Sequence, residues 1–166
     1  VSAAEIAAAE ATIRPAIHRT TIMRSRFLSE RLGVDLCLKL ELQQKTGSFK
    51  ARGARNRMAA LTPAERERGV ISVSAGNHAQ AVAWAARDAG VAATVVMPEG
   101  AVQSKVEATR GYGATVIQVP GSELLASMER LRAERDLVFV PPFDDRRIIA
   151  GAATCGTELL DDVPDA

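Results

Sequence analysis

The sequence predicts an α/β protein built on a parallel β-sheet, and its second half carries that prediction. Four short apolar runs, at residues 70–74, 92–97, 114–119 and 137–140, alternate with segments of helical length. The connections between them are short, which is typical of repeated βαβ units and a parallel sheet. The composition agrees, because aromatic residues make up only 4% of the chain and small aliphatic side chains must fill the core.

The first third of the chain is expected to contribute helices and one strand. A serine–glutamate capping box begins a helix that should run to about Arg14, where Pro15 stops it. Residues 16–25 are expected to form an irregular connection, followed by a short helix that ends at Gly33. The apolar residues at 34–40 predict a strand.

The remaining helices follow from their caps. A helix over about 49–61 should start directly after a turn at Thr46–Ser48, and a short helix should be capped by Thr62. Ser122 is expected to open a helix at 122–135. The other helices are expected at 79–89, 104–112 and 144–160.

The charge balance and the cysteines exclude several classes of function. The net charge of +1 comes from 21 basic and 20 acidic residues, so nothing favours a nucleic-acid or membrane partner. Arg52, Arg55 and Arg57 are expected to lie on a solvated helix face. Cys37 and Cys155 form no CxxC pair or Cys/His cluster, so we expect neither a metal site nor a disulfide framework.

The distribution of apolar residues also argues against membrane insertion and export. No run approaches the roughly 18 apolar residues of a transmembrane helix. The Ala-rich N-terminus lacks the basic region of a signal peptide. These features favour a cytoplasmic protein.

Lys50 stands where the predicted helix at 49–61 begins, which is an unusual place for a cation. A helix N-terminus carries partial positive charge and disfavours a lysine by roughly 0.3–1 kcal/mol. The ordinary interpretation is a solvated surface lysine. The alternative is an amine with a lowered pKa, which acts as a nucleophile or holds a Schiff base.

A second candidate segment, Ser74-Ala75-Gly76-Asn77-His78, joins a predicted strand to a helix at the sheet edge where ligands bind. Gly76 permits a close backbone approach. The Ser74 hydroxyl, the Asn77 amide and the first N–H groups of the helix suit an anion or a ring oxygen. The ordinary interpretation is a tight turn with helix caps. His78 is a candidate general base, although a histidine in a first helical turn is more often structural.

Together the two segments resemble the fold-type II pyridoxal-5'-phosphate (PLP) enzymes, and within them the serine/threonine dehydratases, also called threonine ammonia-lyases. The similarity rests on two long motifs in the family's order, at residues 46–54 and 74–80. Shorter matches are Asn56, Met97-Pro98, Lys105 and residues 111–114, 142–145 and 149–151. Two long motifs at the right separation are far more specific than a single glycine pattern.

The resemblance implies the tryptophan synthase β-like fold, with three layers around a twisted parallel sheet. Residues 1–67 would be the N-terminal part of a large PLP domain, residues 68–142 a small α/β domain, and residues 143–166 the return into the large domain. The family's glycine-rich phosphate-binding loop follows later in the chain. We therefore expect an N-terminal portion that binds the cofactor weakly and is inactive, or nearly so, by itself.

The resemblance also implies a reaction, the conversion of L-threonine or L-serine to a 2-oxo acid and ammonia with PLP as cofactor. Lys50 would be the Schiff-base lysine and the base that removes the α-proton. Phe49 would pack beside the cofactor ring, and Asn77 would hydrogen-bond its 3'-oxygen. The loop Ser74–His78 would receive the substrate carboxylate on its N–H groups. Related serine racemases carry a serine where this chain has Ala75, so alanine favours elimination over racemisation.

Two alternatives remain beside the dehydratase. One is another fold-type II enzyme of β-elimination or β-replacement, such as threonine synthase or cysteine synthase. The other is a non-catalytic α/β fragment or interaction module that keeps the motif. A dinucleotide-binding fold is poorly supported, because no G-x-G-x-x-G follows a strand. The expected partners are a small amino-acid substrate and further copies of the chain, in a dimer or tetramer.

Overall fold

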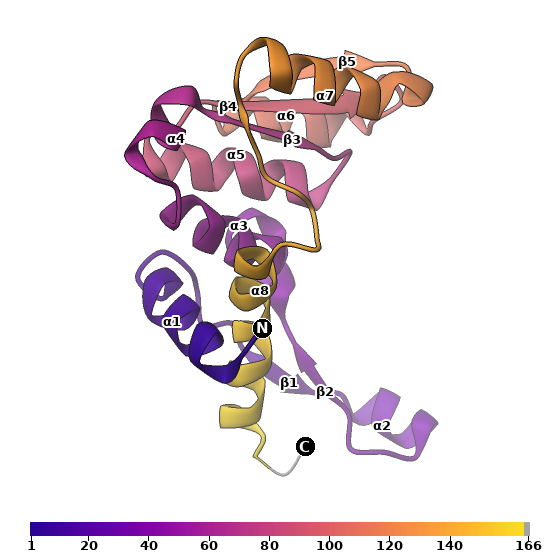
Figure 1. The fold of residues 1–166 in the computed structure, drawn as a ribbon. Helices are drawn as coiled ribbons and strands as arrows, with labels where there is room; N and C mark the ends of the chain where they lie inside the picture. The colour runs from indigo at the N-terminus through magenta and orange to yellow at the C-terminus, as the bar shows by residue number, and fades with distance from the viewer. Residues whose placement is uncertain (165–166) are drawn as a thin grey trace.

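The computed structural model describes residues 1–164. In Figure 1 a four-stranded sheet with its helices forms the upper part of the molecule, and a helical base with a small two-stranded sheet forms the lower part. The chain starts in the base, enters the upper part after α3 (Lys50–Ala59), and returns to the base in α8 (Arg146–Asp162). Within residues 1–164, no helix is long and apolar enough to cross a membrane.

The upper sheet is parallel, with strand order β5-β4-β3-β6, which confirms the predicted α/β arrangement. Its strands are β3 (Val70–Val73), β4 (Ala93–Pro98), β5 (Thr115–Val119) and β6 (Val138–Phe139). Successive side chains of a strand point to opposite faces. Accordingly, Val70 and Val95 belong to one core cluster, whereas Ile71 and Val96 belong to a second cluster.

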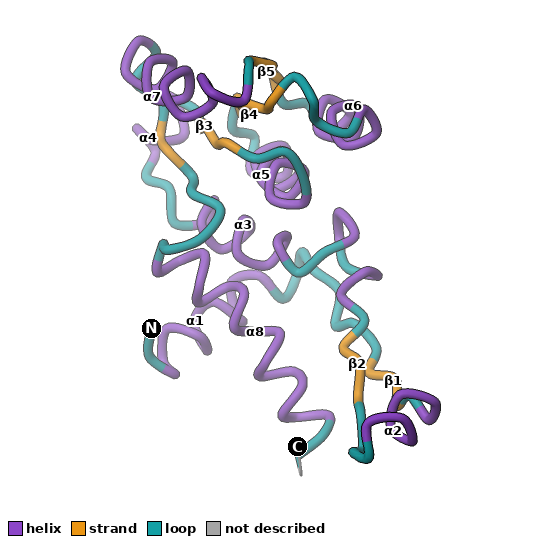
Figure 2. Tube along the Cα trace, turned by 90° about the vertical axis from the view of Figure 1, so that its right-hand side faces the viewer, coloured by secondary structure: helices purple, strands orange, loops and turns teal. Residues whose placement is uncertain are grey.

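Helices cover both faces of this sheet (Figure 2). They are α4 (Pro63–Arg68), α5 (Asn77–Ala89), α6 (Gln103–Gly111) and α7 (Leu124–Glu134). Val82 of α5 and Val106 of α6 belong to the larger core cluster, which also includes Met58 of α3. On the other face, α7 contributes Met128 and Leu131 to the smaller cluster. The sheet is therefore the middle of three layers.

In the base, α8 packs against both α1 (Ala3–Ile13) and α3, although more than 80 residues separate α3 from α8 in sequence. Two glycines make the crossing of α3 and α8 very close. A Cβ atom on Gly151 would lie 2.6 Å from the carbonyl oxygen of Arg52 and 2.8 Å from the Cα atom of Gly53. Larger side chains would therefore push α8 away from the helix that begins with Lys50.

The base also carries an arm that the sequence did not predict correctly. β1 (Ile22–Arg24) pairs antiparallel with β2 (Cys37–Lys39), and α2 (Arg26–Leu32) connects them. The prediction of an irregular connection over 16–25 was therefore wrong in part, and the strand predicted at 34–40 is shorter. Three residues carry too little alternation to identify a strand, and the pairing partner is separated by the whole of α2. The helix end at Gly33 is confirmed, with φ of 70°.

Local capping signals were more reliable at some helices than at others. The capping boxes at Ser2 and Thr62 are both present. By contrast, Ser122 makes no capping hydrogen bond; it lies in a 3-10 turn before α7, which begins at Leu124. The last helix begins after Asp145, whose carboxylate accepts hydrogen bonds from two N–H groups of its first turn.

The predicted solvated arginine face of α3 is also wrong. Arg52 is 0% exposed and donates hydrogen bonds to the carboxylates of Glu41 and Glu158. Arg55 and Arg57 are only 21% and 14% exposed, and they face aspartates of α5 and of the α8 cap. Neither acidic partner of Arg52 lies within one helical turn of it, so no local pattern announces this buried network.

Candidate active site

Lys50 is the first residue of α3, and a sharply turned segment leads into it. Thr46 and Gly47 both have positive φ, 62° and 70°. A β-branched residue rarely adopts this conformation, so the turn needs support from its surroundings. Gln44, 4% exposed, supplies it: its side-chain oxygen accepts from the backbone N–H of His18 at 2.9 Å and of Lys45 at 3.0 Å. Sequence reasoning missed Gln44, because its partner lies 26 residues away.

The Lys50 amine is held in a half-buried position without a neutralising carboxylate. Its Nζ donates a 2.6 Å hydrogen bond to the carbonyl oxygen of Pro142 and lies 5.3 Å from the centre of the Phe49 ring. Among residues 1–164, no carboxylate lies within ion-pair distance of this nitrogen. Burial lowers the pKa of Lys50 below its ordinary value. This agrees with the interpretation of Lys50 as an activated amine.

An apolar cleft of about 370 Å³ opens beside this amine. Phe49, Gly53 and Pro142 line it, together with Phe143 and residues of the first turns of α8. Phe143 is 71% exposed, so the cleft offers an apolar surface at the protein boundary. The surroundings of Lys50 can therefore receive a planar ring.

The second predicted segment joins β3 to α5. The Ser74 hydroxyl accepts from the N–H group of Gly76 at 3.2 Å and so shapes the loop. No side chain caps α5, and the N–H groups of its first three residues, 77–79, have no acceptor in the preceding turn. A Cβ atom at Gly76 would meet nothing within 4 Å, and Ala75 is exposed. The start of α5 thus has N–H donors without an acceptor, next to an open position at Gly76.

His78 of this segment has a structural position. Its side chain is 3% exposed, and its Nε2 lies 3.2 Å from the carbonyl oxygen of Val140. A carbonyl accepts only, so Nε2 carries the proton. Burial lowers the pKa of His78 to about 4, so the imidazole is neutral near pH 7. The buried, neutral ring favours the structural interpretation of the His78 side chain. The backbone N–H group of His78 is still one of the donors without an acceptor at the start of α5.

The connection from β6 to α8 ties the two predicted segments together. The carbonyl oxygen of Val140 accepts a hydrogen bond from the Ser72 hydroxyl at 2.8 Å and another from His78 Nε2. The carbonyl oxygen of Pro142 accepts a hydrogen bond from Lys50 Nζ. In addition, α5 packs against the turn that precedes Lys50. Segments that are more than 20 residues apart in the sequence therefore form one site.

Asn77 at the start of α5 is contacted by a residue from a third element. Lys105 of α6 donates from Nζ to the Asn77 side-chain oxygen at 2.9 Å. Lys105 was recognised in the sequence only as a family match, without a role. The signal that could have identified it is a cation in the first turn of a helix, as at Lys50.

Four of the buried polar atoms without partners belong to residues of the two motifs, 46–54 and 74–80. Within residues 1–164 they are Thr46 Oγ1, Ser48 Oγ, His78 Nδ1 and Gln80 Nε2, together with Arg55 Nε, which faces Asp88 at 3.1 Å. Buried polar groups are nearly always satisfied, so a cluster of exceptions is informative. These exceptions indicate a place where a polar ligand or water completes the structure.

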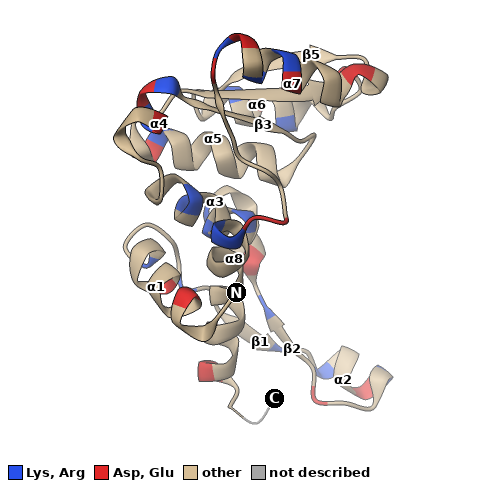
Figure 3. Cartoon of the chain, in the orientation of Figure 1, with Lys and Arg blue, Asp and Glu red and all other residues tan. Residues whose placement is uncertain are grey.

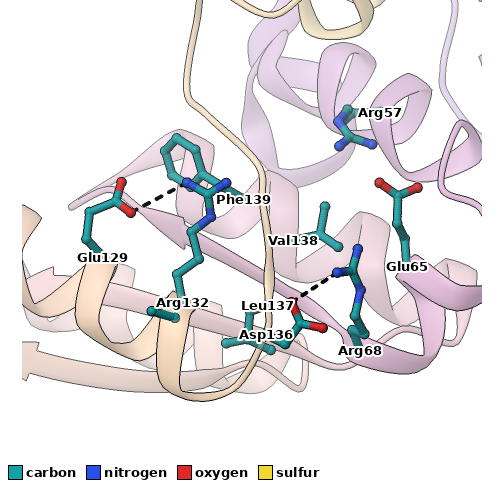
Figure 4. A pocket seen from close by; sticks show the side chains of 10 residues that line it. Arg57, Glu65, Arg68, Glu129, Arg132, Asp136, Leu137, Val138 and Phe139 are labelled. Carbon is teal, nitrogen blue, oxygen red and sulfur yellow. Dashed lines mark hydrogen bonds and ion pairs between the residues drawn. The ribbon is translucent and has the colours of Figure 1, made fainter.

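A larger cavity, of about 490 Å³, lies away from this site, between α4, α7 and β6 (Figure 4). Its arginines stand in the last turns of their helices, where cations offset the helix dipole. Each already has an acidic partner: Arg57 with Asp145, Arg68 with Asp136 and Arg132 with Glu129. The charges in this cavity are therefore balanced, and its size does not indicate a ligand site. Figure 3 shows how the charged residues are distributed over the whole molecule.

No group of three or more His, Cys, Asp and Glu side chains within residues 1–164 is placed to hold a metal ion.

Residues 13–166 match the family described as "Pyridoxal-phosphate dependent enzyme". The chain is 47% identical to "L-threonine dehydratase catabolic TdcB" of Staphylococcus aureus (strain USA300), an alignment that covers 98% of this chain and 48% of that protein.

Solved structures agree with this comparison. The threonine deaminase from T.th. superimposes with a TM-score of 0.91 at 43% identity, over 99% of this chain and 52% of that one. The serine racemase from Dictyostelium discoideum superimposes with a TM-score of 0.93 at 36% identity, over 99% and 54%. The chain spans about half the length of the curated relatives it matches.

Proposed function

We propose, because this chain belongs to the pyridoxal-phosphate dependent enzyme family, that its site serves the β-elimination of L-threonine or L-serine to a 2-oxo acid and ammonia. One observation carries the proposal: the Lys50 amine is half-buried, has a lowered pKa and borders an apolar cleft, and α5, which packs against the turn before Lys50, begins with N–H donors that have no acceptor. The names of the relatives, threonine dehydratase and L-threonine ammonia-lyase, support this reaction over others in the family.

The residues present fit PLP. Condensation with an aldehyde requires a neutral amine, which desolvation of Lys50 favours. The cleft beside Phe49 and Phe143 gives a planar ring an apolar wall. Asn77 can donate to an oxygen on that ring. When bound, PLP supplies the aldehyde carbon that amines condense with and an aromatic ring that takes up the electron pair left on the substrate α-carbon.

Lys50 has two tasks in this proposal. It holds the cofactor before the substrate arrives, and its released amine then takes the α-proton onto Nζ. A base of this kind must be unprotonated when it acts, and the half-buried position serves that need. The carbonyl oxygen of Pro142 gives the amine a defined resting place at 2.6 Å. The side chains of Ser72 and His78 keep that connection in place through Val140.

The loop Ser74–His78 binds and orients the substrate. Its free N–H groups at the start of α5 receive the carboxylate, which the helix dipole also favours. Ala75 offers no hydroxyl on that side of the substrate. Although a serine racemase is among the similar structures, an alanine here can neither give nor take a proton, so elimination is favoured over racemisation.

The domain assignment, the oligomeric state and the location form part of the same proposal. We assign residues 1–67 and 143–166 to a large PLP domain and residues 68–142 to a small domain. The four-stranded parallel sheet, all of whose strands fall within residues 68–142, supports that division. We further propose a cytoplasmic enzyme that works as a homo-oligomer.

The test is the release of 2-oxo acid from L-threonine and L-serine by the complete gene product supplied with PLP. We expect release from at least one of the two. Oxo acid from neither amino acid would contradict the proposal, and turnover of O-activated substrates instead would favour the synthase alternatives. Binding without any turnover would favour the non-catalytic module.

A further inference from the structure

We propose that Lys105 is a positioning residue that fixes the orientation of the Asn77 carboxamide, so that Asn77 presents its NH₂ group, and not its oxygen, to the cofactor ring. The inference rests on the proposed function, because it concerns how Asn77 meets PLP. It adds a residue from α6, a helix that contributes nothing else to the site as described above.

The contact itself determines the orientation. Lys105 Nζ lies 2.9 Å from Asn77 Oδ1 and bridges α6 and α5. An ammonium group has three donors and no acceptor, so it can bond only the oxygen of the amide. Once that oxygen is engaged, the Nδ2 group with its two N–H donors is what Asn77 offers to a ligand. A carboxamide without such a partner can present either end, because the two ends have nearly the same shape.

The place of Lys105 in its own helix does not explain it. Lys105 is the third residue of α6, where the helix dipole disfavours a cation. Glu107, the nearest acid in the sequence, accepts instead from Gln103 at 3.0 Å. In the part of the chain that the structure describes, Lys105 takes part in no ion pair. Its hydrogen bond to Asn77 is thus the interaction that compensates its position.

The orientation matters because the ring oxygen of PLP carries negative charge. An N–H donor stabilises that oxygen, whereas an amide oxygen turned toward it would repel it. Lys105 therefore makes the favourable orientation the only one that satisfies the α5–α6 contact. Asn77 is exposed, so no packing would hold the amide if Lys105 were removed.

The experiment titrates the complete gene product with PLP and follows the Lys50 adduct by absorbance and, after borohydride reduction, by peptide mass. For Lys105→Met we expect an affinity about tenfold weaker, the range of one hydrogen bond to a charged group. Lys105→Arg keeps a donor and should stay within about threefold of the wild type. In an Asn77→Ala background, Lys105→Met should have no further effect, because Lys105 acts through Asn77.

A second readout separates positioning from a merely structural role. Loss of the N–H donor leaves the anionic ring oxygen less stable, so the Lys50 adduct should keep its proton to higher pH in Lys105→Met than in the wild type. Asn77→Asp, an acceptor at the same place, should shift the titration in the same direction. It provides this test even if Lys105→Met folds poorly.

Three results would overturn the inference while leaving the proposed function intact. They are unchanged PLP affinity and adduct titration in Lys105→Met, an equal loss of affinity in the Asn77→Ala background, and wild-type behaviour of Asn77→Asp. A wild-type complete gene product that forms no adduct on Lys50 would overturn the proposed function itself, and the inference with it.

Discussion

Lys50 and Arg52 stand two residues apart on the same helix, yet their surroundings are opposite. Arg52 is fully buried, and two carboxylates and a threonine hydroxyl satisfy its guanidinium group. Lys50 is half-buried, bonds one carbonyl oxygen and borders a cleft, and Thr46 and Ser48 before it each have a buried hydroxyl without a partner. The satisfied guanidinium group of Arg52 therefore holds α3 in place, whereas the incompletely satisfied groups at the start of this helix are available for chemistry.

The largest expected effect is on turnover, and it tests the chemical role of Lys50. Lys50→Ala in the complete gene product should lower dehydratase turnover by at least about 10³-fold, because both the covalent anchor and the proton acceptor are lost. Its thermal stability should be unchanged or slightly higher, since a cation leaves a helix N-terminus. Lys45→Ala, which alters the preceding turn's lysine, is the control. Comparable losses in both variants would contradict the assignment.

The second prediction, Arg52→Met, tests the stabilising role of the buried arginine. It leaves Glu41 and Glu158 without their guanidinium partner, and removing one member of a buried ion pair costs about 3–5 kcal/mol of unfolding free energy. Denaturant unfolding measures the loss. Arg130→Met removes an arginine that is 60% exposed and should change stability by less than about 0.5 kcal/mol. Equal effects of the two substitutions would show that the buried network carries no special weight.

His78 contacts the connection from β6 to α8, and its burial can be tested by the pH dependence of the free energy of unfolding. The pKa of His78 falls to about 4 in the folded protein from an ordinary 6.5, mainly because of burial. Between these values the unfolded chain binds a proton that the folded chain does not. The stabilising contribution is therefore complete above pH 6.5 and is lost toward pH 4, by about 3 kcal/mol.

His78→Gln should flatten this part of the stability curve, as measured by denaturant unfolding at several pH values. His18→Gln, at the exposed second histidine, is the matched control substitution. If both variants titrate as the wild type does, His78 is not buried in its neutral form.

The smallest expected effect sharpens the role of the open loop. Ala75→Ser places a hydroxyl beside the free N–H groups of α5, where a proton can be delivered to the substrate. We expect D-serine to form from L-serine in this variant and not in the parent, as measured by chiral chromatography. A variant Ala75→Val, which adds bulk without a hydroxyl, should form none. Racemisation by the parent would contradict the role given to Ala75.

The sequence predicted what depends on neighbours in the chain. The capping boxes at Ser2 and Thr62, the glycine stop at Gly33 and the parallel sheet of the second half were all confirmed. Lys50 was singled out by its awkward place at a helix N-terminus, and the structure bears out its lowered pKa.

Features that depend on distant partners were missed. The pairing of β1 with β2 and the burial of Arg52 are set by residues that local patterns do not connect. Likewise, Lys105 gains its meaning only when α6 is placed beside α5. Periodicity and capping are local properties, whereas ion pairs and amide orientations follow from the tertiary fold.

The most direct test of the central claim is the position of the adduct formed when the complete gene product is incubated with PLP and reduced with borohydride. We expect one predominant modified lysine, Lys50, identified by peptide mass, and its loss in Lys50→Ala but not in Lys45→Ala. Modification spread evenly over surface lysines, or none at Lys50, would contradict the claim that the first turn of α3 carries the reactive amine.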